Sequence, residues 1–430
     1  MKTCVARLTL CGLALLLLTA AAPSYRLPVI GAAEPKVTGT WQAGKPVTLD
    51  GLSGVFAFLP LPDGKRLLVS TDGYLLQLVD LPAHRVLWKA ENKMQRRFEF
   101  DGASLFDVSA DGAAFLTEGQ SAQGEPRHLV ERSVADGKVL HDYPVVHSTF
   151  FSELAGKDNR YPGPAAAKAH LASGQGAFWV MTPRTARYAG FDRRPLPAGQ
   201  ADRIFATYEH AMTGPNLYDH KAVWLGRSDG SLQGEYQNVA DPKDADFSQP
   251  AGFTAAHFFF PCAYDEKADV LYAGTSFGRV HAVDKAARAR NAKQALVEKK
   301  DPGKVLYVPT SDSRDLETKD AQIVRHLELS PRGDALFVTA GYENGFVQLY
   351  VAGLPSGKEL ARSGIVPLQS VRFVDDDHLV FGARQACVGN VRDGTLAYCP
   401  EPNSRASVNR SRSEVVYLSG GATFTIVRRK

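Results

Sequence analysis

A stretch of short apolar runs separated by turn residues, Ile323 to Leu360, constrains the fold more than any other part of the chain. It contains the runs VRHLEL, ALFVTA, FVQLYV and KEL, separated by PRGD, ENG and PSG. Runs of this length, rich in Val, Leu, Phe and Tyr and bounded by Gly, Pro, Asn and Asp, predict strands joined by tight turns. Four such strands in succession predict an up-and-down antiparallel sheet, which is one blade of a propeller.

The second run of this stretch, ALFVTA, recurs along the chain. Its six relatives share a hydrophobic triplet followed by small or polar residues: RLLVST from Arg66, AAFLTE from Ala113, RIFATY from Arg203, VLYAGT from Val270, HLVFGA from His378 and VVYLSG from Val415. A strand buried on both faces between stacked sheets should be continuously apolar in this way. The repeats predict an all-β, seven-bladed β-propeller, with six or eight blades as alternatives because 147–183 could hide a degenerate unit.

A glycine turn provides a second repeated marker. It stands in the segments VADGKVL, RSDGSLQ, LPSGKEL and VRDGTLA, where one register is occupied by Gly137, Gly230, Gly357 and Gly394. Glycine supplies the positive φ that a tight hairpin needs, so we expect this turn between the third and fourth strands. The blades are then expected at about 52–94, 97–145, 184–237, 252–309, 323–365, 368–400 and 404–430.

The last repeat lacks a fourth strand, because only Lys430 follows TFTIVRR in the sequence. The segment KVTGTW, Lys36 to Trp41, precedes the first repeat and has no other partner. We expect it to complete the last blade and close the ring, which pairs the otherwise open strand edges. Residues 36–430 are therefore predicted to form a single propeller domain.

The N-terminal residues 1–22 have the pattern of a signal peptide. Lys2 and Arg7 precede the apolar run Leu8 to Ala22, which ends in three alanines suited to cleavage. A second cleavage position is possible as late as residue 33. About 15 apolar residues are too few to span a membrane comfortably, so we expect a periplasmic or secreted protein without a transmembrane anchor after cleavage. The formal charge of +4 is too small to suggest nucleic-acid binding.

Export allows disulfides. Cys387 and Cys399 flank the turn around Asp393, and in a hairpin centred there they would face each other across the strands. A disulfide is feasible, and two free buried thiols are the alternative. Cys262 would remain unpaired and is expected to be buried.

Two segments interrupt the repeat. Residues 147–183 contain the turn sequence YPGP and a small helix-permissive run, whereas residues 285–304 carry AARARNAKQALVEKK, whose composition favours a helix. The first segment follows a fourth strand and the second follows a third strand. We therefore expect irregular or helical insertions on opposite faces of the ring.

Two segments carry a family resemblance. ELSPRGDALFVTAG and LVDLPAHRVLWKAE resemble the WD-repeat and quinoprotein-like β-propeller superfamily, including its secreted bacterial members. This resemblance implies a propeller fold and admits lactonase or quinoprotein-dehydrogenase activity. No repeat shows the paired Gly-His and Trp-Asp of the strict WD repeat, and Trp88 is the one clear Trp at the position where a quinoprotein repeats it. No cofactor is therefore expected.

His257 and His326 are the first candidate site residues. The segments AHFFFP and RHLELSP align with both histidines at the same register of the innermost strand in neighbouring blades. Two imidazoles at the rim of a channel could bind a metal or a ligand. The alternative, favoured because no third ligand is evident, is that they pack between blades or face water.

A second candidate is a group of aromatic and ionisable residues between RIFATY and AVWLG: Tyr208, Glu209, His210, Tyr218, Asp219 and His220. In an exposed loop between the second and third strands they could form a binding rim. An ordinary exposed loop is the alternative. The run Asp375-Asp376-Asp377-His378 could bind a hard cation, but its position predicts a solvated turn.

The common catalytic motifs, including Gly-x-Ser-x-Gly, His-Glu-x-x-His and Cys-x-x-Cys-His, are absent from the sequence. We therefore expect an exported, non-enzymatic propeller that docks an envelope or extracellular protein or a small ligand. The alternative is an enzyme with its chemistry in the channel, which predicts a bound metal or quinone. A purely structural component of the cell envelope is a third hypothesis.

Overall fold

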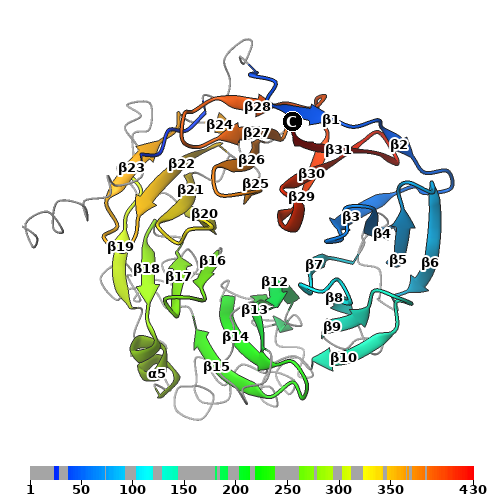
Figure 1. Cartoon of the computed structure of the whole chain (residues 1–430). Helices are drawn as coiled ribbons and strands as arrows, with labels where there is room; N and C mark the ends of the chain where they lie inside the picture. The colour runs from blue at the N-terminus through cyan, green and yellow to red at the C-terminus, as the bar shows by residue number, and fades with distance from the viewer. Residues whose placement is uncertain are drawn as a thin grey trace, which may run out of the picture.

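The computed structural model describes residues 24–28, 37–72, 74–92, 103–119, 128–143, 180–181, 185–191, 203–213, 218–237, 261–275, 278–293, 303–310, 323–341, 346–364, 366–367, 370–382 and 385–430. These residues form seven antiparallel sheets arranged around a ring (Figure 1). The predicted seven-bladed, all-β propeller is therefore confirmed.

The first four blades follow the chain in order from near the N-terminus. The first blade contains β3 (Val55–Pro60), β4 (Arg66–Thr71), β5 (Leu75–Asp80) and β6 (Arg85–Glu91). The second contains β7 (Leu105–Val108), β8 (Ala114–Gly119), β9 (His128–Ser133) and β10 (Val139–Tyr143). The third contains β11 (Val180–Met181), β12 (Thr185–Phe191), β13 (Arg203–Thr213), β14 (Tyr218–Gly226) and β15 (Leu232–Gln237). The fourth contains β16 (Cys262–Asp265), β17 (Val270–Gly274), β18 (Val280–Val283), α5 (Lys285–Lys293) and β19 (Lys304–Tyr307).

The last three blades complete the ring. The fifth contains β20 (Ile323–Leu329), β21 (Ala335–Gly341), β22 (Phe346–Gly353), β23 (Glu359–Arg362) and β24 (Val366–Pro367). The sixth contains β25 (Ser370–Phe373), β26 (His378–Gly382), β27 (Cys387–Asn390) and β28 (Leu396–Tyr398). The seventh contains β29 (Arg405–Asn409), the short 3-10 helix η2 (Arg410–Arg412), β30 (Glu414–Ser419), β31 (Thr423–Arg429), β1 (Trp41–Ala43) and β2 (Val47–Thr48).

Neighbouring blades are held together by apolar clusters. Among the described residues there are seven such clusters, and each joins side chains from two adjacent blades. The second strands supply much of this packing, since every residue of β21 is buried. The continuously apolar repeat segments therefore behave as predicted, because each lies between two neighbouring sheets.

The glycine turn repeats with the same geometry in four blades. Gly137, Gly230, Gly357 and Gly394 have φ values of 72°, 67°, 73° and 75°. In each case the glycine N–H donates to the carbonyl four residues earlier, at 2.8–3.0 Å. At Gly357 a Cβ would lie 1.9 Å from the carbonyl oxygen of Leu306 in the neighbouring blade. Both the turn and the close approach of the fourth blade therefore require glycine there.

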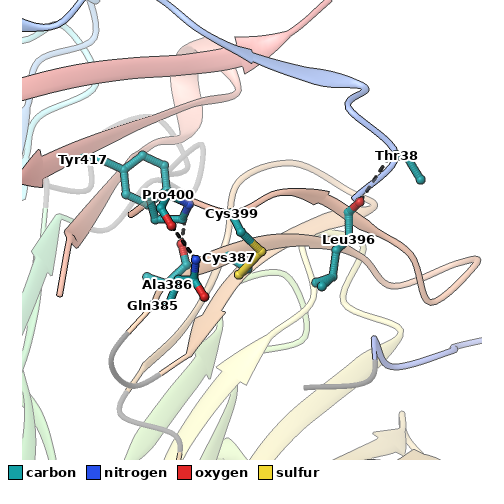
Figure 2. Close-up of a disulfide and its surroundings, with 8 residues drawn as sticks. All are labelled: Thr38, Gln385, Ala386, Cys387, Leu396, Cys399, Pro400 and Tyr417. Atoms are coloured by element: carbon teal, nitrogen blue, oxygen red, sulfur yellow. Dashed lines mark hydrogen bonds between the residues drawn. A yellow bond between two sulfur atoms is a disulfide. The ribbon is translucent and has the colours of Figure 1, made fainter. Parts of the chain in front are cut away.

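The ring is closed by a strand from near the N-terminus. Trp41, Gln42 and Ala43 of β1 pair with Arg429, Arg428 and Val427 of β31. The predicted closure is confirmed, but only Trp41 of the expected segment belongs to this strand. The residues before it run beside the sixth blade, where Val37 bridges Leu396 and the Thr38 N–H donates to the Leu396 carbonyl at 2.8 Å (Figure 2).

A disulfide joins Cys387 of β27 to Cys399, which directly follows β28 (Figure 2). Val388 and Tyr398 are paired in the ladder, so the two cysteines stand opposite each other at its next position. Their Cα atoms are 4.3 Å apart. The two cysteines singled out in the sequence are thus joined across the hairpin expected around Asp393.

The inserted helix α5 lies after the third strand of the fourth blade, within the segment where a helix was predicted. It sits at the outer edge of the ring (Figure 1), where Ala287 packs with Trp224 and Tyr236 of the third blade. Residues 147–179 of the other predicted insertion lie outside the described residues. In the part of the chain that the structure describes, no helix has the length and apolar character needed to cross a membrane.

Candidate functional site in the central channel

The innermost strands surround a cavity of about 1530 Å³. All seven blades contribute to its lining, and it extends onto the turns between the first and second strands of several blades. The innermost strands are β3, β7, β12, β16, β20, β25 and β29 (Figure 1). A cavity of this size exceeds the usual range for small-molecule sites, so the channel has room for a sizeable ligand.

One wall of the channel carries a charged cluster built by three consecutive blades. Glu328 of β20 is buried, with 8% of its side chain exposed. Its Oε2 atom lies 2.9 Å from Arg372 Nη1 of β25, and its Oε1 atom accepts from Arg410 Nη2 of η2. The backbone N–H of Phe373 also donates to Oε1 at 3.2 Å. We call Glu328, Arg372 and Arg410, together with His326, the channel charge cluster.

Glu328 remains ionised in this cluster. Burial alone would raise the pKa of its carboxyl group, but the positive charges of Arg410 and Arg372 outweigh burial and lower that pKa below its usual value. A buried carboxylate is stable in such a place because it is paired and hydrogen-bonded. Glu328 therefore fixes the positions of two arginines that come from different blades.

His326 lies beside this ion pair in the neutral form. Burial, and next the charge of Arg372, lower the pKa of its imidazole to about 4. Its Nε2 atom is 2.9 Å from Arg372 Nη1 and 3.0 Å from the carbonyl oxygen of Val371. The ring nitrogen accepts from the arginine or donates to the carbonyl, according to the tautomer. In either tautomer His326 packs against the Nη1 end of Arg372.

Both arginines keep donor groups directed away from Glu328. Their side chains are 44% and 50% exposed for Arg372 and Arg410 respectively. Among the described residues, the Nε and Nη2 groups of Arg372 have no hydrogen-bond partner, and neither does Nη1 of Arg410. Nε of Arg410 donates to the carbonyl of Phe373 at 3.1 Å. The cluster thus offers several cationic N–H groups to the channel.

The wall formed by the first two blades is more apolar. Phe56 of β3 is 37% exposed, and Phe106 of β7 is partly buried against the core between the second and third blades. Leu59 and Leu105 add partly buried aliphatic surface to the same lining. Phe106, in the second blade, stands across the ring from Arg372 in the sixth, whereas Phe56, in the first blade, lies next to the seventh blade that carries Arg410. The channel therefore has a cationic wall on the fifth to seventh blades and a more apolar wall on the first and second.

Several other polar side chains of the lining are engaged in turns. Asp265 Oδ1 accepts from the N–H groups of Lys267 and Ala268, both at 2.9 Å. The Ser330 hydroxyl donates to Asp334 Oδ1 at 2.7 Å. These contacts are those of polar residues that stabilise a turn. They contrast with the partly unpaired guanidinium groups of the charge cluster.

Of the two histidines predicted to line the channel, the structure places His326 on the innermost strand β20, facing the cavity. His257 lies outside the described residues, so its pairing with His326 stays a prediction. Cys262 was expected to be buried, but the residue lines the cavity and is partly exposed. Its thiol is nevertheless desolvated by the surrounding protein, which raises the pKa of the thiol well above the usual value. Within the described residues, no three metal-binding side chains come together.

The second predicted group, Tyr208, His210, Tyr218 and His220, does not form a loop. These residues extend β13 and β14 into a long hairpin, in which Tyr208 pairs with Lys221, His210 with Asp219, and His220 with Glu209. The apolar triplets predicted the centres of these strands but not their full length. The side chains of this group lie outside the described part, so its predicted role as a binding rim remains a prediction.

The acidic run at Asp375 forms a turn, which agrees with the alternative that the sequence favoured. Asp375 Oδ1 accepts from the backbone N–H groups of Asp377 and His378, at 2.9 and 2.8 Å, and lies 2.9 Å from His378 Nδ1. Asp377 pairs with Arg392 at 2.9 Å and with Arg332 at 3.2 Å. The carboxylates are therefore engaged within the protein.

Glu328, Arg372 and Arg410 were not among the residues predicted from the sequence. One signal was available: Glu328 pairs with Phe337 and Arg372 pairs with Val380, and these partners hold the same position in the second strands of adjacent blades. Opposite charges at one register of neighbouring innermost strands predict a contact between blades. Arg410 stands in a turn, and nothing in the repeat pattern points to it.

Comparisons with known proteins establish the fold of the chain. Neither a protein-family model nor a curated protein sequence matches it. Among solved structures, the β-propeller domain of Cps50 (Swd1) from Myceliophteria thermophila is similar, with a TM-score of 0.51 and 12% sequence identity. The match covers 91% of this chain and 100% of that domain. The fold is WD-repeat-like, and at this identity the similarity concerns the fold alone.

Proposed function

We propose that this protein is an exported, non-enzymatic binding module whose docking site is the central channel. The observation that carries the proposal is the channel charge cluster. Glu328 holds Arg372 and Arg410, both of which line the cavity, and among the described residues Nε and Nη2 of Arg372 and Nη1 of Arg410 have no hydrogen-bond partner. Charged groups that are rigidly positioned and partly unpaired are typical of recognition sites.

Two further features support this proposal. The apolar segment at residues 8–22 and the disulfide between Cys387 and Cys399 both suit a protein that matures in an oxidising compartment. The hydroxyl groups of Ser109 and Ser330 in the lining donate to the nearby carboxylates of Asp111 and Asp334 within their own turns. These hydroxyl groups stabilise the turns in which they lie, which agrees with a binding role for the channel.

Site-specific photo-crosslinking tests where the docking site lies. One variant carries the crosslinking residue at Ser411, which is exposed and lines the cavity, and a matched variant carries it at Leu87 on the outer strand β6, which is 38% exposed. Each is expressed with its leader and irradiated in intact cells. We expect a discrete adduct from the Ser411 variant in the cell envelope or the medium. Adducts from Leu87 alone, or retention of both variants in the cytoplasm, would contradict the proposal.

The competing enzyme hypothesis makes a different prediction. A lactonase or a quinoprotein dehydrogenase would contain a metal or a quinone, respectively, when purified from its natural host. Elemental analysis and an absorbance spectrum of the mature protein measure these directly. A stoichiometric metal or a quinone band would contradict a purely binding role.

A further inference from the structure

The Nε and Nη2 groups of Arg372, which have no hydrogen-bond partner in the part of the chain that the structure describes, have a specific arrangement. An arginine can bind a carboxylate side-on through Nε and Nη2, which present two parallel N–H groups. In Arg372 the other nitrogen, Nη1, is the one that faces Glu328 Oε2 and His326 Nε2, each at 2.9 Å. Among the described residues the Nε and Nη2 edge has no partner, so the edge suited to bidentate binding is the one left open.

Arg410 adds a second donor from the seventh blade. Its Nε is bound to the Phe373 carbonyl and its Nη2 to Glu328, which leaves Nη1 without a partner in the described part. The two carboxylate oxygens of Glu328 bind one arginine each, Oε2 binding Arg372 and Oε1 binding Arg410. The two guanidinium groups are therefore held close together. A ligand oxyanion at the open edge of Arg372 would therefore also lie in the field of Arg410.

The charge of the cluster favours a ligand with a single negative charge. Two guanidinium charges against the one carboxylate of Glu328 leave a net charge of one, because His326 is neutral at physiological pH. A doubly charged phosphate would bring more negative charge than the cluster can balance, beside a carboxylate that already lies in the site. A monocarboxylate matches both the charge and the planar geometry of the open edge.

The apolar wall on the first two blades identifies the rest of the ligand. Phe56 exposes 37% of its surface, and Phe106, which packs against the core between the second and third blades, also lines the same cavity. Burial of apolar surface there would contribute roughly 25 cal/mol for each Å² removed from water. A ligand that satisfies both walls has a carboxylate at one end and an apolar body at the other.

On the basis of the function proposed above, we infer that the channel binds a small amphiphilic monocarboxylic acid. Its carboxylate is held side-on by Nε and Nη2 of Arg372 and its apolar body contacts Phe56 and Phe106. Arg410 supports the same oxyanion. Glu328 and His326 act as positioning residues, since they hold Arg372 with its open edge toward the cavity and do not themselves contact the ligand.

Isothermal titration calorimetry with defined probes tests this inference. The mature protein is titrated with octanoate, and separately with octanamide, which lacks the charge, acetate, which lacks the apolar body, and octanesulfonate, which has a tetrahedral anion. We expect octanoate to bind at least about tenfold more tightly than each of the other three probes. Equal binding of the sulfonate, or no binding of octanoate at millimolar concentration, overturns the inference.

Three variants locate the binding site. Arg372→Lys keeps the charge but removes the side-on edge, and we expect it to weaken octanoate binding about 10- to 100-fold. Arg332→Gln is the matched control, because Arg332 also lines the cavity but its guanidinium pairs with Asp376 and Asp377. Phe56→Ala should weaken octanoate binding and leave that of acetate unchanged. Equal losses in the Arg372 and Arg332 variants would overturn the assignment.

Two controls keep the outcome interpretable. Thermal unfolding shows whether each variant is folded. Arg372→Lys keeps a positive charge beside Glu328, so the buried carboxylate is not left unpaired.

A short peptide with a C-terminal Phe carboxylate is titrated in parallel. Binding of the peptide without binding of octanoate would overturn the small-acid assignment. Failure of all probes beside a positive crosslink at Ser411 would leave the docking function standing and remove only this ligand class.

Discussion

The phenol of Tyr25 donates a hydrogen bond of 2.6 Å to Asp334 Oδ1, in the first turn of the fifth blade, 309 residues away. The ring is 5% exposed and packs edge-on against Phe337, while the Arg392 guanidinium lies 4.3 Å from its centroid. Burial, and next the hydrogen bond to Asp334, raise the pKa of Tyr25 to about 12, so it remains a donor at physiological pH. The segment around Tyr25 therefore bridges the fifth and sixth blades.

On the export proposed above, this bridge predicts where a leader would be removed. The sequence allowed cleavage near residue 22 or as late as residue 33, and only the earlier site retains Tyr25. We expect intact-mass measurement of the exported protein to give a mature N-terminus before Tyr25. A protein that lacks residues 1–33 should be less stable, because it has lost Tyr25. Recovery of a mature chain that starts at residue 34, with full stability, would contradict this role of Tyr25.

Substitution of Tyr25 separates packing from hydrogen bonding. Tyr25→Ala removes a buried aromatic ring and should lower the free energy of unfolding by about 3 kcal/mol or more. Tyr25→Phe keeps the ring and should cost only about 1 kcal/mol through loss of the bond to Asp334. Chemical denaturation of both variants provides the measurement. Equal and negligible effects would show that the segment is not docked in solution.

Trp41 is the point at which the ring closes. It is 2% exposed and packs in the cluster between the sixth and seventh blades, with its ring 5.2 Å from that of His378. Trp41→Ala should destabilise the protein by about 3–5 kcal/mol, because it removes a large buried ring from the closing strand. Gln42→Ala, in the same strand but exposed, is the control and should change the melting temperature little.

The disulfide closes a short loop in the sixth blade. Replacing Cys387 and Cys399 with alanine should lower the free energy of unfolding by about 2–4 kcal/mol, through greater freedom of the unfolded chain. Cys262→Ala serves as the thiol control, since Cys262 is not bridged. A thiol reductant should destabilise the wild type and leave the double variant unchanged. If the wild type is insensitive to complete reduction, the disulfide does not contribute to stability.

His326 should make the protein sensitive to moderate acid. Its folded-state pKa is about 4, below the ordinary 6.5, so between these values the unfolded chain binds more protons and stability falls as pH falls. A shift of this size corresponds to about 3 kcal/mol. His326→Gln should remove this part of the pH dependence. Glu328, whose pKa is lowered, adds an acid sensitivity that remains in the variant.

The measurement for His326 is urea unfolding at intervals from pH 7 to pH 4. As the pH falls across this range, the free energy of unfolding should decrease more for the wild type than for His326→Gln. Parallel curves for the two proteins would contradict the burial of a neutral imidazole beside Arg372.

The fold could be predicted from the sequence because its information is local and repeated. The triplet in ALFVTA lies in a strand buried on both faces, and Gly357 occupies a turn that requires positive φ. The strand ends were less predictable, because β13 and β14 continue through polar residues such as His210 that the apolar pattern does not include. There the pairing of two long strands outweighs the local composition.

The channel cluster could not be predicted in the same way. Glu328, Arg372 and Arg410 come from three blades, and only the closed ring brings them together. A charged residue in an otherwise apolar strand indicates that the residue has a polar partner, but the sequence does not show which residue that partner is. His326 was identified because an imidazole stands out in the sequence, whereas the arginines beside it resemble ordinary surface residues.

A crystal structure of the mature protein grown with saturating octanoate would test the central claim most directly. We predict a ligand in the channel with its carboxylate oxygens within hydrogen-bond distance of Arg372 Nε and Nη2, and its alkyl chain directed toward Phe56 and Phe106. A channel that contains only solvent at saturation, or a ligand bound on the outer strands, would contradict the account.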